Sequence, residues 1–158
     1  MTITQPRRPR GTPTGGQFAP KSQPESDLVV KPSWPGLDRE VLHHGGMRSE
    51  TWSLHLGRTQ DPPDGSPAIK TFDQVGRLVI ESHWTDGLLN DLPDGSPAVR
   101  HLYPDGSIKS ESHWSEGSLQ DPPDGSPAIT HFWPDGSVES ESHWVAGVRQ
   151  PSSAGATC

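Results

Sequence analysis

Apolar and polar positions alternate along this chain in short segments that glycine- and proline-rich turns separate. Residues 128 to 132 and residues 138 to 144, on either side of one such turn, are interpreted as two segments of this kind. A period of two is typical of half-buried β-strands, and two alternating segments around a short turn indicate a β-hairpin. The pattern therefore predicts an all-β fold.

The turn between these segments consists of Trp133 followed by Pro134, Asp135 and Gly136. Proline fixes φ at about −65° early in a turn, aspartate tolerates the bend, and glycine supplies a positive φ. A three-residue loop closed by a bulge fits this composition. Gly106 holds the same place in the preceding unit, so Gly106 and Gly136 are predicted to be structural anchors.

The flanking strands are predicted to pair antiparallel, with Trp133 opposite Ser137. This register places the following pairs on one face: Phe132 with Val138, Thr130 with Ser140, and Ala128 with Ser142, with Trp144 continuing that face. The opposite face would carry a mixed and solvent-exposed set: Ile129, His131, Trp133, Glu139, Glu141 and His143.

The hairpin belongs to a 30-residue unit that occurs three times without a gap, at residues 61–90, 91–120 and 121–150. Repeats of this length usually form one supersecondary unit each, and they gain stability by stacking on their neighbours. We therefore predict an antiparallel β-hairpin repeat meander with one hairpin per unit. One stripe of large apolar residues is expected to hold the repeats together: Phe72, Leu102 and Phe132 with Trp84, Trp114 and Trp144.

Residues outside the three units differ from them in composition. Residues 33–60 show a strand-like alternation from Trp52 to Leu56, and we interpret them as a degenerate repeat that caps the array. Residues 1–32 are rich in proline, glycine and polar residues, which predicts a disordered basic arm, and residues 151–158 are predicted to be a disordered tail. Because only 28% of the chain is hydrophobic, against roughly 45–50% apolar usage in globular domains, no deep core is expected.

Charge is distributed unevenly between the arm and the repeats. Residues 61–150 contain 15 Asp and Glu against 5 Lys and Arg, whereas residues 1–32 contain 2 against 5. An acidic array repels nucleic-acid phosphates, so direct nucleic-acid binding by the repeats is not expected. A basic protein would be attracted instead.

The repeated histidines raise the question of a metal site, because each follows a glutamate by two residues: His83, His113 and His143. Equivalent residues two strands apart lie roughly 9–10 Å from each other, whereas zinc ligands lie about 2 Å from one ion. Within the last repeat, a site would need four residues of the mixed face: His131, Glu139, Glu141 and His143. Glu139 is replaced by Lys109 and Val79 in the other units, so these residues are interpreted as a solvated face. No metal or other cofactor is predicted.

Catalysis is not indicated either. Asp61, Asp64 and Ser66 offer oxygen atoms of the kind that calcium binds, but aspartate beside glycine and proline is what turns require. The sequence shows no Ser, Cys or Thr nucleophile paired with a general base that occurs only once, and no glycine-rich phosphate-binding loop at the start of a helix. The chain is not expected to be an enzyme, and no catalytic residue is predicted.

No stretch of the chain approaches the roughly 18 apolar residues of a membrane span. The cluster of Arg7, Arg8 and Arg10 is not followed by the apolar segment of a secretory signal. A cytoplasmic location without membrane contact is therefore expected. Cys158 is the only cysteine, so an internal disulfide is impossible.

The segments Trp114–Leu119, Asp124–Ile129 and Pro134–Ser137 resemble the MORN-variant repeats of YwqK-like proteins, and they are similar to repeats of phages and viruses. The likeness covers about residues 57 to 150. It implies a β-hairpin array that serves as an interaction scaffold, and the YwqK-like members imply an antitoxin or immunity function. The chain departs from the pattern by a serine inserted in Asp-Gly-Ser-Pro-Ala and by lacking the His-Arg that often precedes that motif.

A second resemblance concerns the segment Arg10–Ala19. It looks like a segment that opens many uncharacterised proteins of high-GC Gram-positive bacteria and their phages. The likeness implies either a linear motif that a common partner reads or a disordered leader.

Three functional hypotheses remain open. The first is binding of another protein, in the manner of an antitoxin that faces a basic toxin or a nucleic-acid enzyme. Its predicted contacts are Trp133, Glu139, Glu141, His143, Asp94 and Asp124. The second is glycan or cell-surface binding through the repeated tryptophans, and the third is a structural role in a phage or mobile element. The sheet edges are a route to a dimer under any of them.

Overall fold

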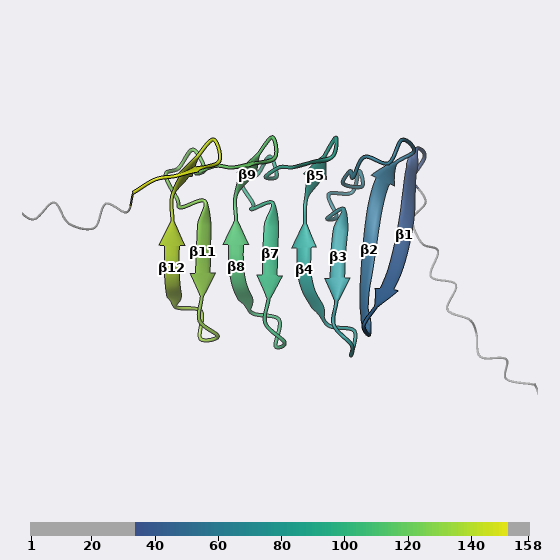
Figure 1. The fold of residues 1–158 in the computed structure, drawn as a ribbon, viewed down its shortest axis with the longest axis horizontal. Coiled ribbons are helices and arrows are strands. Elements are labelled where there is room, and N and C mark those ends of the chain that lie inside the picture. Colours follow the sequence, from purple (N-terminus) through teal and green to yellow (C-terminus); the bar gives the residue numbers. More distant parts are fainter. Residues whose placement is uncertain (1–33, 152–158) are drawn as a thin grey trace, which may run out of the picture. The chain divides into compact units, whose positions relative to one another are not determined.

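The computed structural model describes residues 34–151. These residues form antiparallel β-structure without a helix, in which eight strands make one sheet and six short strands make three separate hairpins (Figure 1). The predicted all-β hairpin meander is confirmed. The arm predicted for residues 1–32, and all but the first residue of the predicted tail 151–158, lie outside the described residues.

The large sheet follows the order of the chain, and every neighbouring pair of its strands is antiparallel. Its strands are β1 (Leu37–His44), β2 (Met47–Leu54), β3 (Ile69–Phe72), β4 (Leu78–Ser82), β7 (Val99–Leu102), β8 (Ile108–Ser112), β11 (Ile129–Phe132) and β12 (Val138–Ser142). The short hairpins pair β5 (Trp84–Thr85) with β6 (Leu88–Leu89), β9 (Trp114–Ser115) with β10 (Ser118–Leu119), and β13 (Trp144–Val145) with β14 (Val148–Arg149). Each 30-residue unit therefore contributes two hairpins, and the prediction of one per unit was wrong.

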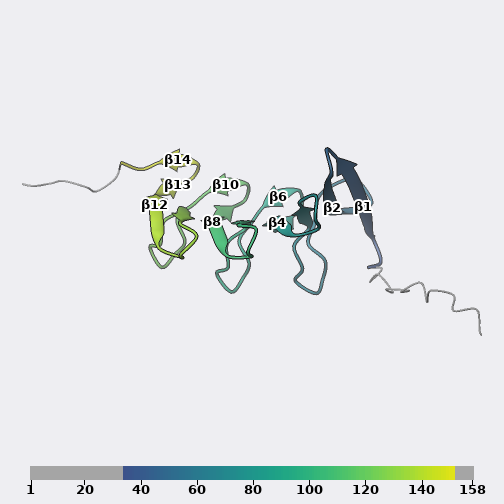
Figure 2. The ribbon, with the colours of Figure 1, turned by 90° about the horizontal axis from the view of Figure 1, so that it is seen from below.

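The second hairpin of each unit forms because two consecutive residues adopt positive φ. In the first unit these are Asp86 at 51° and Gly87 at 84°, between the paired residues Thr85 and Leu88. Two positive φ values define a type I′ turn, whose twist matches that of a two-residue hairpin loop. The short hairpins recur at each unit at one end of the sheet (Figure 1) and lie to one side of the long strands (Figure 2).

The main turn of the last unit is the predicted one. The Gly136 N–H donates to the Trp133 carbonyl at 2.9 Å, and the Trp133 N–H donates to the Ser137 carbonyl at 2.8 Å. Gly136 has a φ of 83°, a conformation that a side chain would disfavour. The three-residue loop predicted from Pro134 to Gly136 is confirmed.

The register of the main hairpin departs from the prediction beyond its first pair. Phe132 pairs with Val138 as predicted, but a register shift follows, so that His131 pairs with Ser140. Glu139 is the extra residue of a β-bulge, which sets two residues of one strand against one of the other. The predicted pairs Thr130 with Ser140 and Ala128 with Ser142 were wrong: Thr130 pairs with Glu141, and Ile129 with Ser142.

The bulge reverses which side of the sheet the rest of β12 faces, because side chains alternate along a strand. Glu141 lies on the side of Thr130 and Phe132, and this side is called the ladder face below. Ser140 and Ser142 lie on the side of His131 and Ile129, called the tryptophan face because the indole N–H of Trp144 donates to the Ser142 hydroxyl at 2.9 Å. The predicted single stripe and the predicted mixed face were both wrong, since Phe132 and Trp144 lie against opposite faces, as do Glu141 and Ile129.

The core of residues 34–151 is shallow, as the composition predicts. Ala68, Ala98 and Ala128 are fully buried, and no larger side chain reaches that degree of burial within these residues. The predicted anchors are half-buried: Phe72, Leu102, Phe132, Trp84, Trp114 and Trp144. Stability must therefore come from many modest contacts and from hydrogen bonds between segments.

Candidate protein-interaction site

An aspartate at the first position of each unit joins three parts of that unit. One carboxylate oxygen of Asp91 accepts the N–H groups of Ala98 at 2.8 Å and Trp114 at 2.9 Å. The other lies 2.7 Å from Nδ1 of His113. We call this arrangement the Asp–His staple, because it ties the proline-rich loop to the end of a long strand and the start of a short hairpin.

The staple recurs with nearly identical distances in all three units. The carboxylate-to-Nδ1 distance is 2.7 Å for Asp61 and His83 and 2.8 Å for Asp121 and His143. Sequence reasoning missed this role and treated the aspartate as a turn residue. The signal that points to it is the occurrence of aspartate 22 residues before each repeated histidine.

Burial and hydrogen bonding shift the pKa of Asp121, the aspartate of the last staple, in opposite directions. Partial burial raises the pKa of Asp121, but hydrogen bonds from the Trp144 N–H, the His143 ring and the Ala128 N–H outweigh it. The pKa of Asp121 therefore lies below the usual value of an aspartate, and the carboxylate is ionised at neutral pH.

The hypothetical metal site of the last unit is not assembled. His131 lies opposite Ser140 on the tryptophan face, whereas Glu141 lies opposite Thr130 on the ladder face. Among residues 34–151, no group of three or more His, Cys, Asp or Glu residues is arranged to hold a metal ion. Nδ1 of His143 instead donates to the ionised Asp121 carboxylate in its staple.

A charged row crosses the ladder face. Successive cross-strand neighbours in this row are Glu50, Lys70, Glu81, Arg100, Glu111, Thr130 and Glu141. Arg100 contacts both of its neighbours, Glu111 at 2.9 Å and Glu81 at 3.7 Å. Alternation of charge is thus maintained until Thr130, which stands where a cation would continue the pattern.

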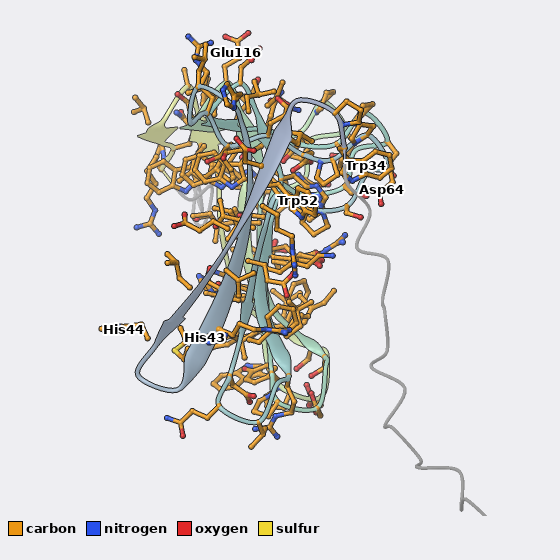
Figure 3. The ribbon with its side chains drawn as sticks, turned by 90° about the vertical axis from the view of Figure 1, so that its right-hand side faces the viewer. Trp34, His43, His44, Trp52, Asp64 and Glu116 are labelled. Carbon is orange, nitrogen blue, oxygen red and sulfur yellow. The ribbon has the colours of Figure 1, made fainter. Side chains whose placement is uncertain are left out.

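Asp94 and Asp124, two of the predicted contact residues, lie on exposed loops that flank one groove. The groove has a volume of about 610 Å³, and its lining includes Arg100, Glu111 and His113. Hydrogen bonds from Ser96 and Ser126 hold the pKa values of Asp94 and Asp124 below the usual value. Asp64 occupies the same position in the first unit. Glu116 projects at the opposite end of the sheet from His43 and His44 (Figure 3).

The aromatic residues fall into two groups. The repeated tryptophans are half-buried, and each indole N–H donates to a serine of its own unit, as Trp114 does to Ser112 at 2.9 Å. Trp133 is different, with 51% of its surface exposed. Tyr103 holds the same position one unit earlier, and its hydroxyl donates to the Phe132 carbonyl of the following unit at 2.9 Å.

The remaining predicted contacts, Glu139, Glu141 and His143, lie on or beside β12 at the last edge of the sheet.

Residues 34–151 include no helix with the length and apolar character that a membrane crossing requires. Comparison with protein-family models gave no match, and comparison with curated proteins gave none either.

Proposed function

We propose that the chain is a non-enzymatic protein-interaction module that binds a basic partner in the cytoplasm, in the manner of an antitoxin or immunity factor. The observation that carries this proposal is the row of exposed loop aspartates, Asp64, Asp94 and Asp124. Hydrogen bonds donated by serines lower the pKa of each of them, so all three are charged at neutral pH.

Carboxylates outnumber the cations of the repeats, with 15 Asp and Glu against 5 Lys and Arg in residues 61–150, and two of the arginines are paired with carboxylates. Arg100 is held between two glutamates of the ladder face, and the guanidinium of Arg77 contacts Asp73 at 2.8 Å. The repeats therefore carry a net negative charge, to which the exposed loop aspartates contribute. The field of such a charge speeds encounter with a cationic surface, including that of an enzyme whose groove accepts phosphates.

Glycan binding through the repeated tryptophans has less support. Stacking on sugars needs exposed ring faces, whereas Trp84, Trp114 and Trp144 are half-buried against the sheet. Their indole N–H groups are already occupied by serine hydroxyls. A protein partner fits the exposed carboxylates better than a neutral polysaccharide does.

The test is affinity capture from the native host with the immobilised full chain, at low and at high salt. A variant with Asp64→Asn, Asp94→Asn and Asp124→Asn is compared with the wild type. Asparagine retains a side-chain oxygen that can accept the serine N–H, so the loops keep their shape while three charges are removed. We expect a basic protein that is bound at low salt, released at high salt and captured poorly by the variant.

A matched control removes the same number of charges elsewhere, through Asp38→Asn, Glu40→Gln and Asp86→Asn. This control should capture the partner as well as the wild type does. Capture that ignores salt, or that both variants weaken equally, would count against the loop aspartates. Recovery of cell-wall glycan in place of a protein would contradict the proposal.

A further inference from the structure

We propose that the outer edge of β12 is a docking site for an extended basic segment of another protein, which adds to the sheet as a further antiparallel strand. The inference deepens the proposed function, on which it rests for the basic character of the partner. Strand addition of this kind supplies affinity through main-chain hydrogen bonds and specificity through alternate side chains.

The interior of the array shows what such an edge binds. β4 is followed in the sheet by β7, and β8 is followed by β11. At these junctions the N–H of His83 donates to the Ala98 carbonyl, and the N–H of His113 donates to the Ala128 carbonyl, both at 2.7 Å. His143 holds the equivalent position after β12, and no strand among residues 34–151 pairs with that side.

Exposure confirms that this edge is uncovered by the described residues. The exposed fraction of the repeated histidine side chain rises from 7% at His83 to 14% at His113 and 42% at His143. Val138 is 50% exposed at the other end of β12. The edge thus offers the same backbone groups and the same Glu-Ser-His sequence as β4 and β8, without the strand that covers those.

The charged row specifies a basic residue in the incoming strand. At the junction of β4 and β7, Arg100 stands directly opposite Glu81. At the junction of β8 and β11, Thr130 stands opposite Glu111, whose other neighbour is Arg100. At the outer edge, Glu141 has only the uncharged Thr130 as its cross-strand neighbour. An arginine or lysine opposite Glu141 would restore the alternation that Thr130 interrupts, and opposite charges across a strand pair are stabilising.

The neighbouring positions add two further requirements. Val99 lies opposite Ser82 and Ile129 lies opposite Ser112, so a β-branched apolar residue is expected opposite Ser142. Trp133 stands where Tyr103 reaches across to a carbonyl of the next strand. Its indole N–H is a donor with the same opportunity toward a carbonyl of the incoming segment.

A second copy of the chain meets these requirements poorly. Two β12 strands paired antiparallel about Ser140 would set Glu139 opposite Glu141, and like charges directly opposite are destabilising. The other edge strand, β1, offers Arg39, but this guanidinium already contacts Glu50 at 2.6 Å. A foreign basic segment is the better occupant.

The test uses a labelled peptide that copies residues 96–103, the strand that β4 receives within the array. Binding to the full chain is measured by fluorescence anisotropy. Backbone NMR shifts map the contact. We expect shifts centred on Val138 to His143, and we expect Glu141→Lys to weaken binding about tenfold through replacement of attraction by repulsion. A peptide carrying Arg100→Glu should bind the Glu141→Lys chain better than the wild-type chain.

The matched control is Glu40→Lys, which makes the same charge change on an exposed residue of β1, the opposite edge. It should leave binding unchanged, and Glu141→Gln should give a smaller loss than Glu141→Lys. The docking site is refuted by absence of binding at millimolar peptide, by equal effects of the two lysine variants, or by shifts on β1. Sedimentation that shows self-association through β12 would refute it in favour of a second copy.

The two proposals can fail separately. If the peptide does not bind while the loop aspartates still govern capture of a basic protein, the edge site is wrong and the acidic module stands. If the peptide binds at β12 while the loop variant captures its partner normally, the edge is a site and the loop aspartates are not.

Discussion

Replacement of Asp91 by alanine should be among the most damaging single substitutions in the repeats. The change leaves three hydrogen-bonding groups without their acceptor: the N–H of Ala98, the N–H of Trp114 and Nδ1 of His113. A buried donor left unsatisfied costs about 1–3 kcal/mol. Ala98 is fully buried, so its N–H has no access to water, whereas the His113 side chain is 14% exposed.

We therefore assign about 2 kcal/mol to the Ala98 amide and about 1 kcal/mol to each of the other two groups, which gives a loss of roughly 3–5 kcal/mol. Asp91→Asn should cost much less, about 1 kcal/mol, because its oxygen still accepts both amides and its NH₂ can donate to a neutral His113 ring. The ratio between these two losses is the diagnostic quantity.

The measurement is urea unfolding followed by tryptophan fluorescence, with the slope m compared across variants so that a change in stability is separated from a change in cooperativity. Asp94→Ala is the control, since Asp94 is exposed and its side chain accepts only the nearby Ser96 N–H at 2.9 Å. Its loss should be clearly smaller. A loss below about 1 kcal/mol for Asp91→Ala, or equal losses for the alanine and asparagine variants, would refute the staple as a main source of stability.

The remaining predictions concern pH and backbone conformation. The folded pKa of Asp121 lies below its unfolded value, so the contribution of Asp121 to stability is present above about pH 4 and is lost as the pH falls through the folded pKa. Asp121→Asn should lower the stability at pH 7 and make the stability depend less on acid, as measured by unfolding at pH 7 and pH 3. Glu116 has a φ of 48°, which asparagine tolerates better, so Glu116→Asn should raise stability by about 0.5–1 kcal/mol, while Ser115→Asn beside it should not. Gly117 has a φ of 77°, and a Cβ there would lie 3.1 Å from Cδ2 of Leu88; Gly117→Ala should therefore destabilise by about 1–3 kcal/mol, and an unchanged melting temperature would contradict this.

The sequence was sufficient for the features that depend on local residues. The turn from Pro134 to Gly136 could be predicted from the sequence because proline, aspartate and glycine each have a distinct conformational preference. The second hairpin was harder to predict. Asp86 and Gly87 are a typical pair for its turn, but Glu116 and Ala146 take the place of Asp86 in the other units.

The bulge could not be read from the pattern of β12. Its residues after Val138 are glutamate and serine in alternation, so both faces are polar and a reversal of facing leaves no hydrophobic signature. The prediction that Glu141 shares a face with His131 failed for this reason. The resulting charged row and the open acidic edge became apparent only with the pairing of strands.

The Asp–His staple was hidden by its distance along the chain. Its partners lie 22 residues apart, and neither is unusual in its local context. Comparison of the three units with each other would have helped, because a position that keeps aspartate in every copy beyond the turn itself needs a reason.

The staple also has a consequence for how such a chain can change over time. Asp61 binds His83 and Asp91 binds His113, so each staple closes within its own 30-residue unit. Duplication or loss of one whole unit in the gene would leave every remaining staple intact. The strands that then meet would be of the same kind as those that already pair between neighbouring units. Array length is therefore free to vary by recombination, while the sequence of the final unit decides which side chains lie along the β12 edge.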